Sequence, residues 1–221
     1  MSAHRFEDER FLRGKGRYVA DINRENQLYA KIVRSIHGHA KIINIDISDA
    51  LTVDGVCGIY VEDDLAKDGV GALPCTTKFV AEQPLVVAER YALARDKVRY
   101  VGDPVALVLA ETEMAAQEAA ELVLVDYEAL PVLVSPVNSM QDGSPLIWSN
   151  APKNIAYRFK KGEKESTAAA FDGAAHVVEL DIENNRVMAL PIEPRAGIGE
   201  YDPKNDVMRL ICTAQGVHAI R

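Results

Sequence analysis

Side chains that could do chemistry come close together in the stretch HGHA. It places His37 and His39 two residues apart, so both imidazoles would lie on one side of an extended chain and could contribute to a metal site. Two ligands are too few to hold a metal ion, and no nearby Cys, Asp or Glu completes the set. A role in a turn or on the surface is therefore the favoured interpretation of this pair.

Two further stretches carry polar groups of interest. In LPIEPRAG, Glu193 and Arg195 are separated by one residue, so on a strand they would share a side and form a local ion pair. A catalytic role for Glu193 would need a pocket, which the sequence does not reveal. In TAQGVHAIR, the amide of Gln215 could donate a hydrogen bond to an oxo or carbonyl oxygen, although a single loop glutamine usually has no such role.

Glycine-containing stretches that might bind phosphate do not have the required pattern. GKGRYV falls short of both a P-loop and a G-x-G-x-x-G fingerprint, and is interpreted as a flexible lead-in to a strand. In YVGDPV, Pro104 has no N–H to offer and Asp103 would repel an anion, so a tight structural turn is expected.

Composition indicates a globular protein and excludes several classes. Of 221 residues, 48% are hydrophobic, which is enough for a core. The net charge of -8, with scattered Lys and Arg, argues against binding of nucleic acid.

The three cysteines are too far apart for a zinc or iron–sulfur site: Cys57, Cys75 and Cys212. The first residues lack the apolar region of a signal peptide, and VALVLA, the longest apolar run, is too short to cross a membrane. A cytoplasmic location without membrane contact is predicted.

The clearest secondary structure lies in DKVRYVGDPVALVLAET. A turn at GDP leads into VALVLA, an unbroken apolar strand that should be buried on both faces. Thr112 can cap the helix EMAAQEAAELV, and LVDYEALP follows as a strand, which together suggest a βαβ-like or split βαβ unit. Upstream, two strands flank SIHGHA, a short helix fits between Ser48 and Gly55, and CGIYVEDDL is a further strand.

The second part of the chain begins with a proline-rich stretch. Residues 131–152 contain four prolines and are predicted to be a linker between residues 1–130 and residues 153–221. Beyond it we expect a short helix in KESTAAAFDGAA, then strands in HVVELDIE, RVMALPIE, AGIGEYD and VMRLICTA, with a hairpin turn at DPKND. The fold class is therefore α+β, with a strand-rich second part that looks incomplete.

Six stretches, in order, resemble the start of the molybdenum-binding large subunit of the xanthine dehydrogenase and aldehyde oxidase family, in its branch similar to aerobic carbon monoxide dehydrogenase. They are RFEDERFLRGKGRYVADI, LYAKIVRSIHGHAKI, KVRYVGDPVALVLAET, AAELVLVDYEALPVLV, NRVMALPIEPRAGIGEYD and TAQGVHAIR. The resemblance implies an α/β hammerhead domain over residues 1–130, and the incomplete first segment of a molybdopterin-binding domain over residues 153–221. Gln215 matches the glutamine that, in the family, donates a hydrogen bond to an oxygen ligand of molybdenum.

The same resemblance implies what the chain needs from elsewhere. The family's glycine-rich loop and catalytic glutamate lie beyond the position equivalent to Arg221, so no catalytic residue or metal ligand is expected here. The complete enzyme would carry a molybdenum–molybdopterin cofactor, in its cytosine dinucleotide form, which this chain alone would not hold tightly. It would hydroxylate an aldehyde, an N-heterocycle or carbon monoxide.

Its partners would be the remainder of the large subunit, an FAD-binding medium subunit and a [2Fe-2S] small subunit, to which the electrons pass. Strands without their partners should expose apolar surface in the second part. The alternative is a non-catalytic protein–protein assembly module derived from the hammerhead domain. A free-standing nucleotide-binding protein ranks last, because no phosphate loop is present.

Overall fold

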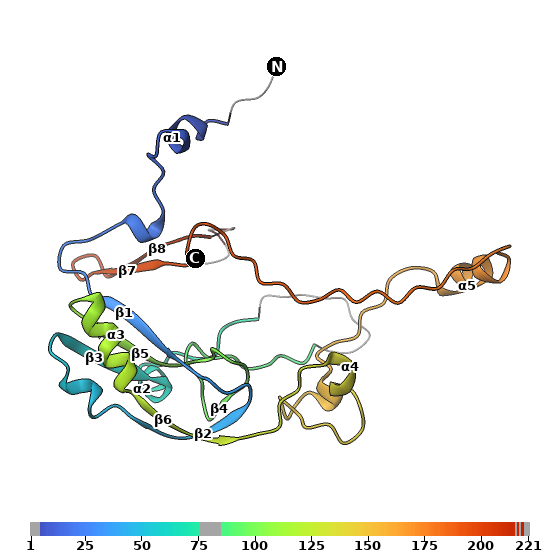
Figure 1. Ribbon diagram of the computed structural model, residues 1–221, viewed down its shortest axis with the longest axis horizontal. Helices are drawn as coiled ribbons and strands as arrows, with labels where there is room; N and C mark the ends of the chain where they lie inside the picture. The colour runs from blue at the N-terminus through green and yellow to red at the C-terminus, as the bar shows by residue number, and fades with distance from the viewer. Residues whose placement is uncertain (1–4, 76–84, 215, 217, 219–221) are drawn as a thin grey trace. The chain divides into compact units, whose positions relative to one another are not determined.

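The computed structural model describes residues 5–75, 85–214, 216 and 218 (Figure 1). It divides into two compact units, one formed by Leu28–Val177 and the other by the described parts of Met1–Gln27 and Val178–Arg221. Each unit is described by itself below. The smaller unit combines two separate stretches of the sequence, whereas each predicted domain is one continuous stretch, so the predicted boundaries stay a prediction.

The larger unit contains two three-stranded antiparallel sheets. The first holds, in spatial order, β1 (Tyr29–Arg34), β5 (Pro104–Ala110) and β3 (Val56–Val61). The second holds β4 (Lys97–Val98), β2 (Ala40–Asp46) and β6 (Leu124–Ala129). The predicted strands on both sides of SIHGHA are confirmed as β1 and β2.

Strand β5 is the centre of this unit, as its unbroken apolar sequence predicts. Val105, Ala106, Val108 and Ala110 have no exposed surface. Val105 packs in one cluster with Ala40 and Val98, whereas the other three belong to the two clusters beneath the helix. Both faces of β5 are therefore covered, which explains its unbroken apolar sequence.

Helix α3 (Glu113–Leu122) begins at the predicted cap. The Thr112 hydroxyl accepts a hydrogen bond from the Ala115 amide at 3.1 Å. Ala115 and Ala116 pack against Ala110 of β5 in one cluster, where their small side chains allow the helix to approach the sheet. Figure 1 shows α3 alongside β1 and β5.

The predicted βαβ unit is wrong. Strands β5 and β6 flank α3 in the sequence, but they belong to different sheets, and each is antiparallel to its neighbours. A βαβ unit requires two parallel strands of one sheet. Instead, β6 pairs with β2 over the length of both strands, so the helix connects one sheet to the other.

Two short helices of this unit differ from their predictions. The helix expected after Ser48 is a single 3-10 turn, η2 (Ala50–Thr52), which follows Asp49 and has no side-chain cap. Helix α2 (Glu62–Lys67) begins where β3 ends, although the sequence indicated only the end of a strand. The Asp64 carboxylate accepts a hydrogen bond from the Val61 amide at 3.0 Å, which explains why the acidic run starts a helix.

The predicted linker, residues 131–152, holds the short helix α4 (Pro136–Ser139), and the 3-10 turn η3 (Pro152–Asn154) begins at its last residue. It is followed by α5 (Lys164–Asp172), the helix expected in KESTAAAFDGAA, whose residues are all exposed.

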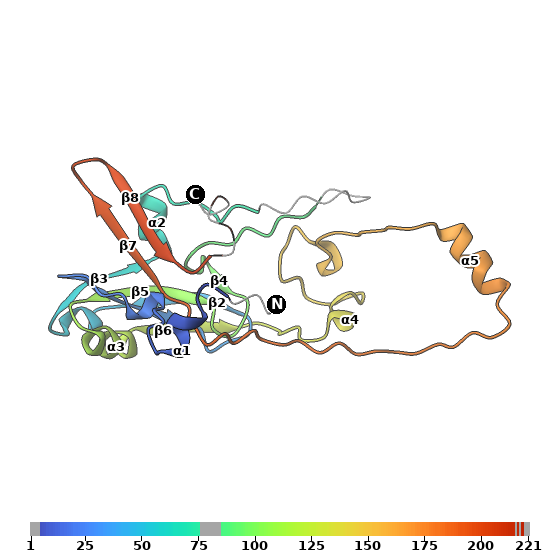
Figure 2. The same cartoon turned by 90° about the horizontal axis from the view of Figure 1, so that it is seen from above.

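The smaller unit combines both ends of the sequence. Its N-terminal residues form α1 (Asp8–Leu12) and the 3-10 turn η1 (Val19–Asp21), so the strand expected after GKGRYV is wrong. Its C-terminal residues form the predicted hairpin of β7 (Gly197–Asp202) and β8 (Val207–Cys212), visible in Figure 2. The two strands pair from Gly197 with Cys212 to Asp202 with Val207.

The strands predicted in HVVELDIE and RVMALPIE are also wrong. Residues 176–192 contain no helix or strand. The alternation of apolar and acidic residues in Val178–Glu183 is typical of a strand, but a strand also needs a neighbour for its backbone hydrogen bonds. The apolar side chains here are exposed, from Leu180 at 76% to Val178 at 91%. The prediction of exposed apolar surface in the second part is therefore confirmed.

Candidate functional site

The residue predicted to bind the cofactor, Gln215, lies outside the described residues. The site is therefore built from the strand that leads to it. Strand β8 ends at Cys212, and Thr213 and Ala214 separate it from Gln215 in the sequence. The contacts that hold β8 in place are therefore described first.

The turn of the hairpin is closed by its own polar side chains. Asp202 accepts hydrogen bonds from the Lys204 amide at 3.0 Å and from the Asn205 side chain at 2.7 Å. The bond from Asn205 is the main cause that holds the pKa of the Asp202 carboxyl below its ordinary value. Asp206 adopts the left-handed backbone conformation, with φ 51°, that a tight turn needs. The predicted turn at DPKND is confirmed.

A second set of contacts joins the hairpin to the N-terminal residues. Glu200 of β7 forms ion pairs with Arg24 and with Arg209 of β8, the latter at 3.1 Å. Hydrogen bonds from Arg24 first, and then from Arg209, lower the pKa of the Glu200 carboxyl. One carboxylate therefore holds three segments of the smaller unit together.

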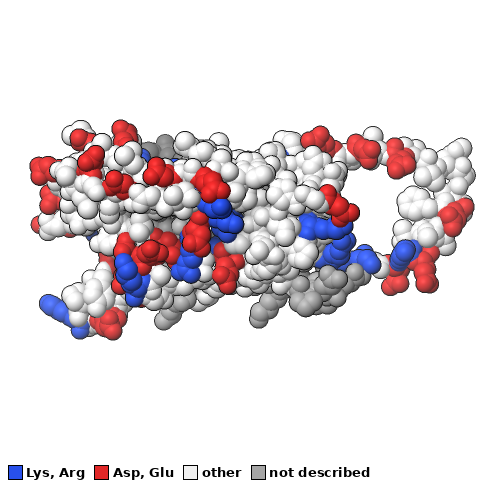
Figure 3. Space-filling view, turned by 90° about the horizontal axis from the view of Figure 1, so that it is seen from below, with Lys and Arg blue, Asp and Glu red and all other residues white. Residues whose placement is uncertain are grey.

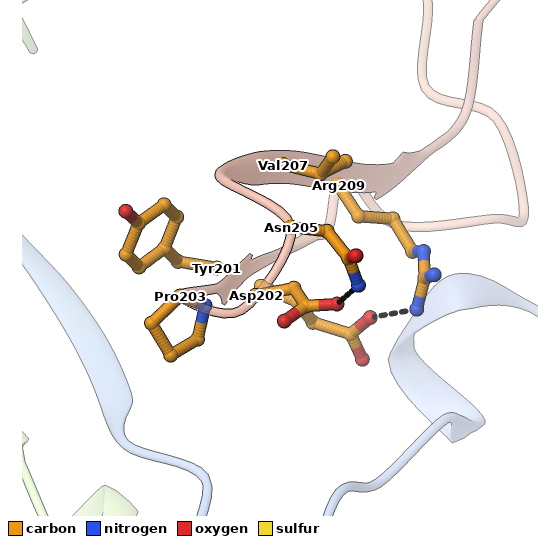
Figure 4. Close-up of a pocket in the computed structure, with 7 residues that line it drawn as sticks. Tyr201, Asp202, Pro203, Asn205, Val207 and Arg209 are labelled. Carbon is orange, nitrogen blue, oxygen red and sulfur yellow. Dashed lines mark hydrogen bonds and ion pairs between the residues drawn. The ribbon is translucent and has the colours of Figure 1, made fainter.

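A pocket lies against this turn (Figure 4). Its lining residues are Glu200, Tyr201, Asp202, Pro203, Asn205, Val207 and Arg209. Figure 4 shows Asn205 directed at Asp202. Arg209 donates a hydrogen bond to the Glu200 carboxylate at 3.1 Å. These polar groups already bind one another, so the pocket is a consequence of the hairpin turn and is not assigned a ligand.

Glu193 makes contacts that the sequence did not predict. Its Oε1 accepts a hydrogen bond from the Thr213 hydroxyl at 2.7 Å and a longer one from the Val19 amide at 3.4 Å. Among the described residues, Arg195 is not an ion-pair partner of Glu193, so the predicted local pair is wrong. The partners lie 20 and 174 residues away in the sequence, a separation that no local pattern reveals.

The two histidines of HGHA have different surroundings. His37 takes part in the predicted turn, where its amide donates to the Ser35 hydroxyl at 3.0 Å, and its ring lies 4.8 Å from that of Tyr127. His39 is buried, so a surface role is wrong for it. Its Nδ1 lies 2.9 Å from the Pro131 carbonyl oxygen, and its Nε2 has no partner among the described atoms. Within the described residues, no three His, Cys, Asp or Glu side chains group together to hold a metal ion.

The stretch YVGDPV is a structural turn, as predicted. Gly102 has a φ of 90°, and the Asp103 carboxylate accepts a hydrogen bond from the Arg99 amide at 2.9 Å. The guanidinium of Arg99 stacks 3.8 Å from the ring of Trp148, and its burial lowers the pKa of the group. This contact attaches the proline-rich stretch to the second sheet.

The described surface carries charges of both signs. On the face in Figure 3, Lys and Arg side chains are interspersed with Asp and Glu. No helix in the described part of the chain has the length and apolar character needed to cross a membrane.

Two family profiles match successive parts of the chain. Residues 13–131 match the profile described as aldehyde oxidase and xanthine dehydrogenase, a/b hammerhead domain, and residues 147–221 match the molybdopterin cofactor-binding domain. The resemblance inferred from the six sequence stretches is thereby confirmed, and so is the α+β fold class with a hammerhead domain.

Individual proteins give the same result. Over 98% of its length, the chain is 36% identical to the nicotine 6-hydroxylase large subunit of Paenarthrobacter nicotinovorans, of which it covers 26%. It is 34% identical, again over 98% of its length, to the carbon monoxide dehydrogenase large chain of Afipia carboxidovorans, of which it covers 27%. The crystal structure of quinoline 2-oxidoreductase from Pseudomonas putida 86 matches 97% of the chain with a TM-score of 0.84 and 29% identity, covering 27% of that structure. The chain thus spans about a quarter of the length of these proteins.

Proposed function

The chain belongs to the aldehyde oxidase and xanthine dehydrogenase family, and we propose that it forms the first part of the molybdenum-binding large subunit of a molybdenum hydroxylase. The observation that carries the proposal is the order of the two matches, a hammerhead domain followed by a molybdopterin cofactor-binding domain. The division into residues 1–130, a linker at 131–152 and residues 153–221 is part of this proposal.

The residues around the end of β8 fit a cofactor of this kind. When bound, the molybdenum cofactor would supply the oxidative hydroxylation, as cofactors do for most redox chemistry. The chain would contribute orientation through Gln215, a neutral side chain that can donate hydrogen bonds and that follows β8, a strand paired with β7 along its whole length. In the proposed role, the Gln215 amide donates to an oxygen ligand of molybdenum without competing as a charged ligand.

The names of the relatives guide the choice of substrate. Nicotine and quinoline are N-heterocycles, and the third relative is named for carbon monoxide. We therefore propose an N-heterocycle or carbon monoxide ahead of an aldehyde. The cytosine dinucleotide form of the cofactor remains part of the proposal, and chromatography of the nucleotide released from the purified enzyme would test it.

The proposed partners are the remainder of the large subunit, an FAD-binding medium subunit and a [2Fe-2S] small subunit, in the cytoplasm. Two relatives are themselves named as a large subunit and a large chain, which supports an enzyme of several subunits. The exposed apolar side chains between Val178 and Ile192 support a further partner that covers them.

Substitution of Gln215 tests the role of this chain at the cofactor. In the complete enzyme, Gln215→Ala should lower kcat/KM by roughly 10–100-fold, the usual effect of losing a group that orients a metal ligand, and should alter the molybdenum(V) resonance spectrum. Molybdenum content should stay near that of the wild type. The exposed Gln141, in the linker, provides a matched control, and Gln141→Ala should change none of these. An unchanged spectrum and unchanged kcat/KM in Gln215→Ala would refute the proposed role.

A further inference from the structure

Glu193 connects three segments of the smaller unit that are remote in the sequence. It lies before β7, and its Oε1 accepts hydrogen bonds from Thr213, after β8, and from Val19, in η1. The 2.7 Å distance to the Thr213 hydroxyl is a normal length for a hydrogen bond from a hydroxyl to a carboxyl oxygen. Glu193 is half-buried, whereas Thr213 is exposed.

The position of this bond relative to the hairpin gives it its importance. The paired part of β8 ends at Cys212, opposite Gly197. Thr213 is the next residue, and its bond to Glu193 lies one residue beyond the last pair of the ladder. A chain that leaves a strand is free to change direction unless a side chain fixes it. Glu193 provides that restraint at the point where the chain continues to Gln215.

Glu200, within β7, provides a useful comparison. It also binds one N-terminal group, Arg24, and one group of β8, Arg209. The two carboxylates have similar roles: Glu200 joins the N-terminal residues and β8 to β7, and Glu193 joins the N-terminal residues and the segment after β8 to the segment before β7. They differ in place, because Arg209 lies near the turn and Thr213 lies where the chain leaves the hairpin.

We infer that Glu193 is a positioning residue for the segment that leads to Gln215, acting through its hydrogen bonds to Thr213 and Val19. The inference rests on the proposed function in that Gln215 is the group being positioned. Glu193 touches no reacting atom in this account. Its effect is to fix where the chain leaves β8, and a displacement of a supporting segment by about 1 Å can cost up to 100-fold in rate.

The test compares variants of the complete, cofactor-loaded enzyme. In Glu193→Ala, hydrogen exchange of a peptide that contains Thr213 should become roughly tenfold faster, because the bond that restrains it is lost. The value of kcat per bound molybdenum should fall roughly tenfold with little change in KM, and the molybdenum(V) spectrum should shift. Glu193→Gln keeps an acceptor oxygen and should restore most of each property.

Two other variants protect the test against a general loss of folding. Thr213→Val removes the hydroxyl and leaves Glu193 intact, so it should reproduce the effects of Glu193→Ala, whereas Thr213→Ser should resemble the wild type. Glu200→Ala is the matched control. It should speed exchange near the turn and leave both the Thr213 peptide and kcat per molybdenum unchanged.

The outcomes separate the two claims. If Glu193→Ala lowers molybdenum content and total activity in proportion, with kcat per molybdenum and the spectrum unchanged, Glu193 is only structural and the inference is overturned. Unchanged exchange at Thr213 would overturn it as well. If Gln215→Ala affects catalysis and Glu193→Ala does not, the inference alone fails. If Gln215→Ala has no effect, the proposed function of Gln215 fails, and the exchange data still decide whether Glu193 restrains Thr213.

Discussion

Asn154 closes the proline-rich stretch through three hydrogen bonds. Its Oδ1 accepts from the Ile147 amide at 2.9 Å, and its Nδ2 donates to the carbonyl oxygens of Ser139 and Pro145 at 2.9 and 3.0 Å. Its backbone has a φ of 56°, a conformation that asparagine tolerates better than most residues. A single side chain therefore orders a segment whose composition indicated a linker.

Asn154→Ala should destabilise the chain by about 2 kcal/mol, because it removes three hydrogen bonds. It also places an alanine in a left-handed backbone conformation, which alanine tolerates less well than asparagine. The measurement is the free energy of unfolding in urea. Asn150→Ala is the control, because that side chain is exposed and makes one hydrogen bond of 3.3 Å, to the Val87 carbonyl. Equal losses in the two variants would show that Asn154 does not hold this segment closed.

The residue scale also shows what the sequence could not predict. The amide of Gln215 has no feature that separates it from any loop glutamine, and only the resemblance of the surrounding stretch gave it a role. The bond between Glu193 and Thr213 was missed because it depends on the hairpin register, which brings residues 20 positions apart together. The burial of His39 was missed because it depends on the pairing of β2 with β6.

At the scale of elements, local signals predicted structure where all the necessary interactions are close in sequence. The cap at Thr112 and the alanine-rich sequence after it sufficed to predict α3, and the apolar run of β5 predicted its burial. The strands expected in 176–183 and 186–193 failed because no described strand lies beside them to complete their hydrogen bonds. The assignment of each strand to a sheet could not be predicted either. It depends on which strand β6 pairs with, and that partner, β2, is remote in the sequence.

The hairpin gives a prediction about pH. The pKa of Glu200 is lowered by Arg24 and Arg209, so its folded carboxyl holds a proton less readily than the unfolded one, whose ordinary value is 4.5. The ionised Glu200 carboxylate therefore contributes its full stabilisation of the folded state at pH values above 4.5. This contribution is lost as the pH falls through the lower pKa of the folded state.

The difference in unfolding free energy between the wild type and Glu200→Gln should accordingly be constant from pH 7 to pH 5 and shrink below pH 4.5. Urea denaturation across this range measures it. Glu9→Gln is the control, because its ion pair with Arg13 is highly exposed and should contribute little at any pH. A difference that grows on acidification would contradict the assigned role of Glu200.

At the scale of the whole molecule, the main feature is the exposed apolar segment between Val178 and Ile192. In its first part, Val178–Glu183, apolar side chains alternate with Glu179, Asp181 and Glu183, so one side of an extended chain would be apolar there and the other acidic. Such a segment is suited to pairing with a strand supplied by another chain or by a further part of a longer one. In isolation it should cause association.

We expect the isolated chain to self-associate through this segment. Replacing Leu180, Ile182, Leu190 and Ile192 with serine should shift the sedimentation profile towards the monomer, because it removes the apolar surface. In a matched control, serine replaces four residues of the larger unit that are similarly exposed: Ile36, Val101, Met114 and Val134. This control variant should associate nearly as much as the wild type. A wild type that is monomeric, or equal effects of both sets, would contradict this expectation.

The most direct measurement of the central claim is the molybdenum content of the complex purified from native cells through this chain, with its subunits identified by mass spectrometry. The account predicts about one molybdenum per chain, together with the remainder of the large subunit, a flavin subunit and an iron–sulfur subunit. A chain that is recovered alone and without molybdenum would contradict the account and would favour a non-catalytic module.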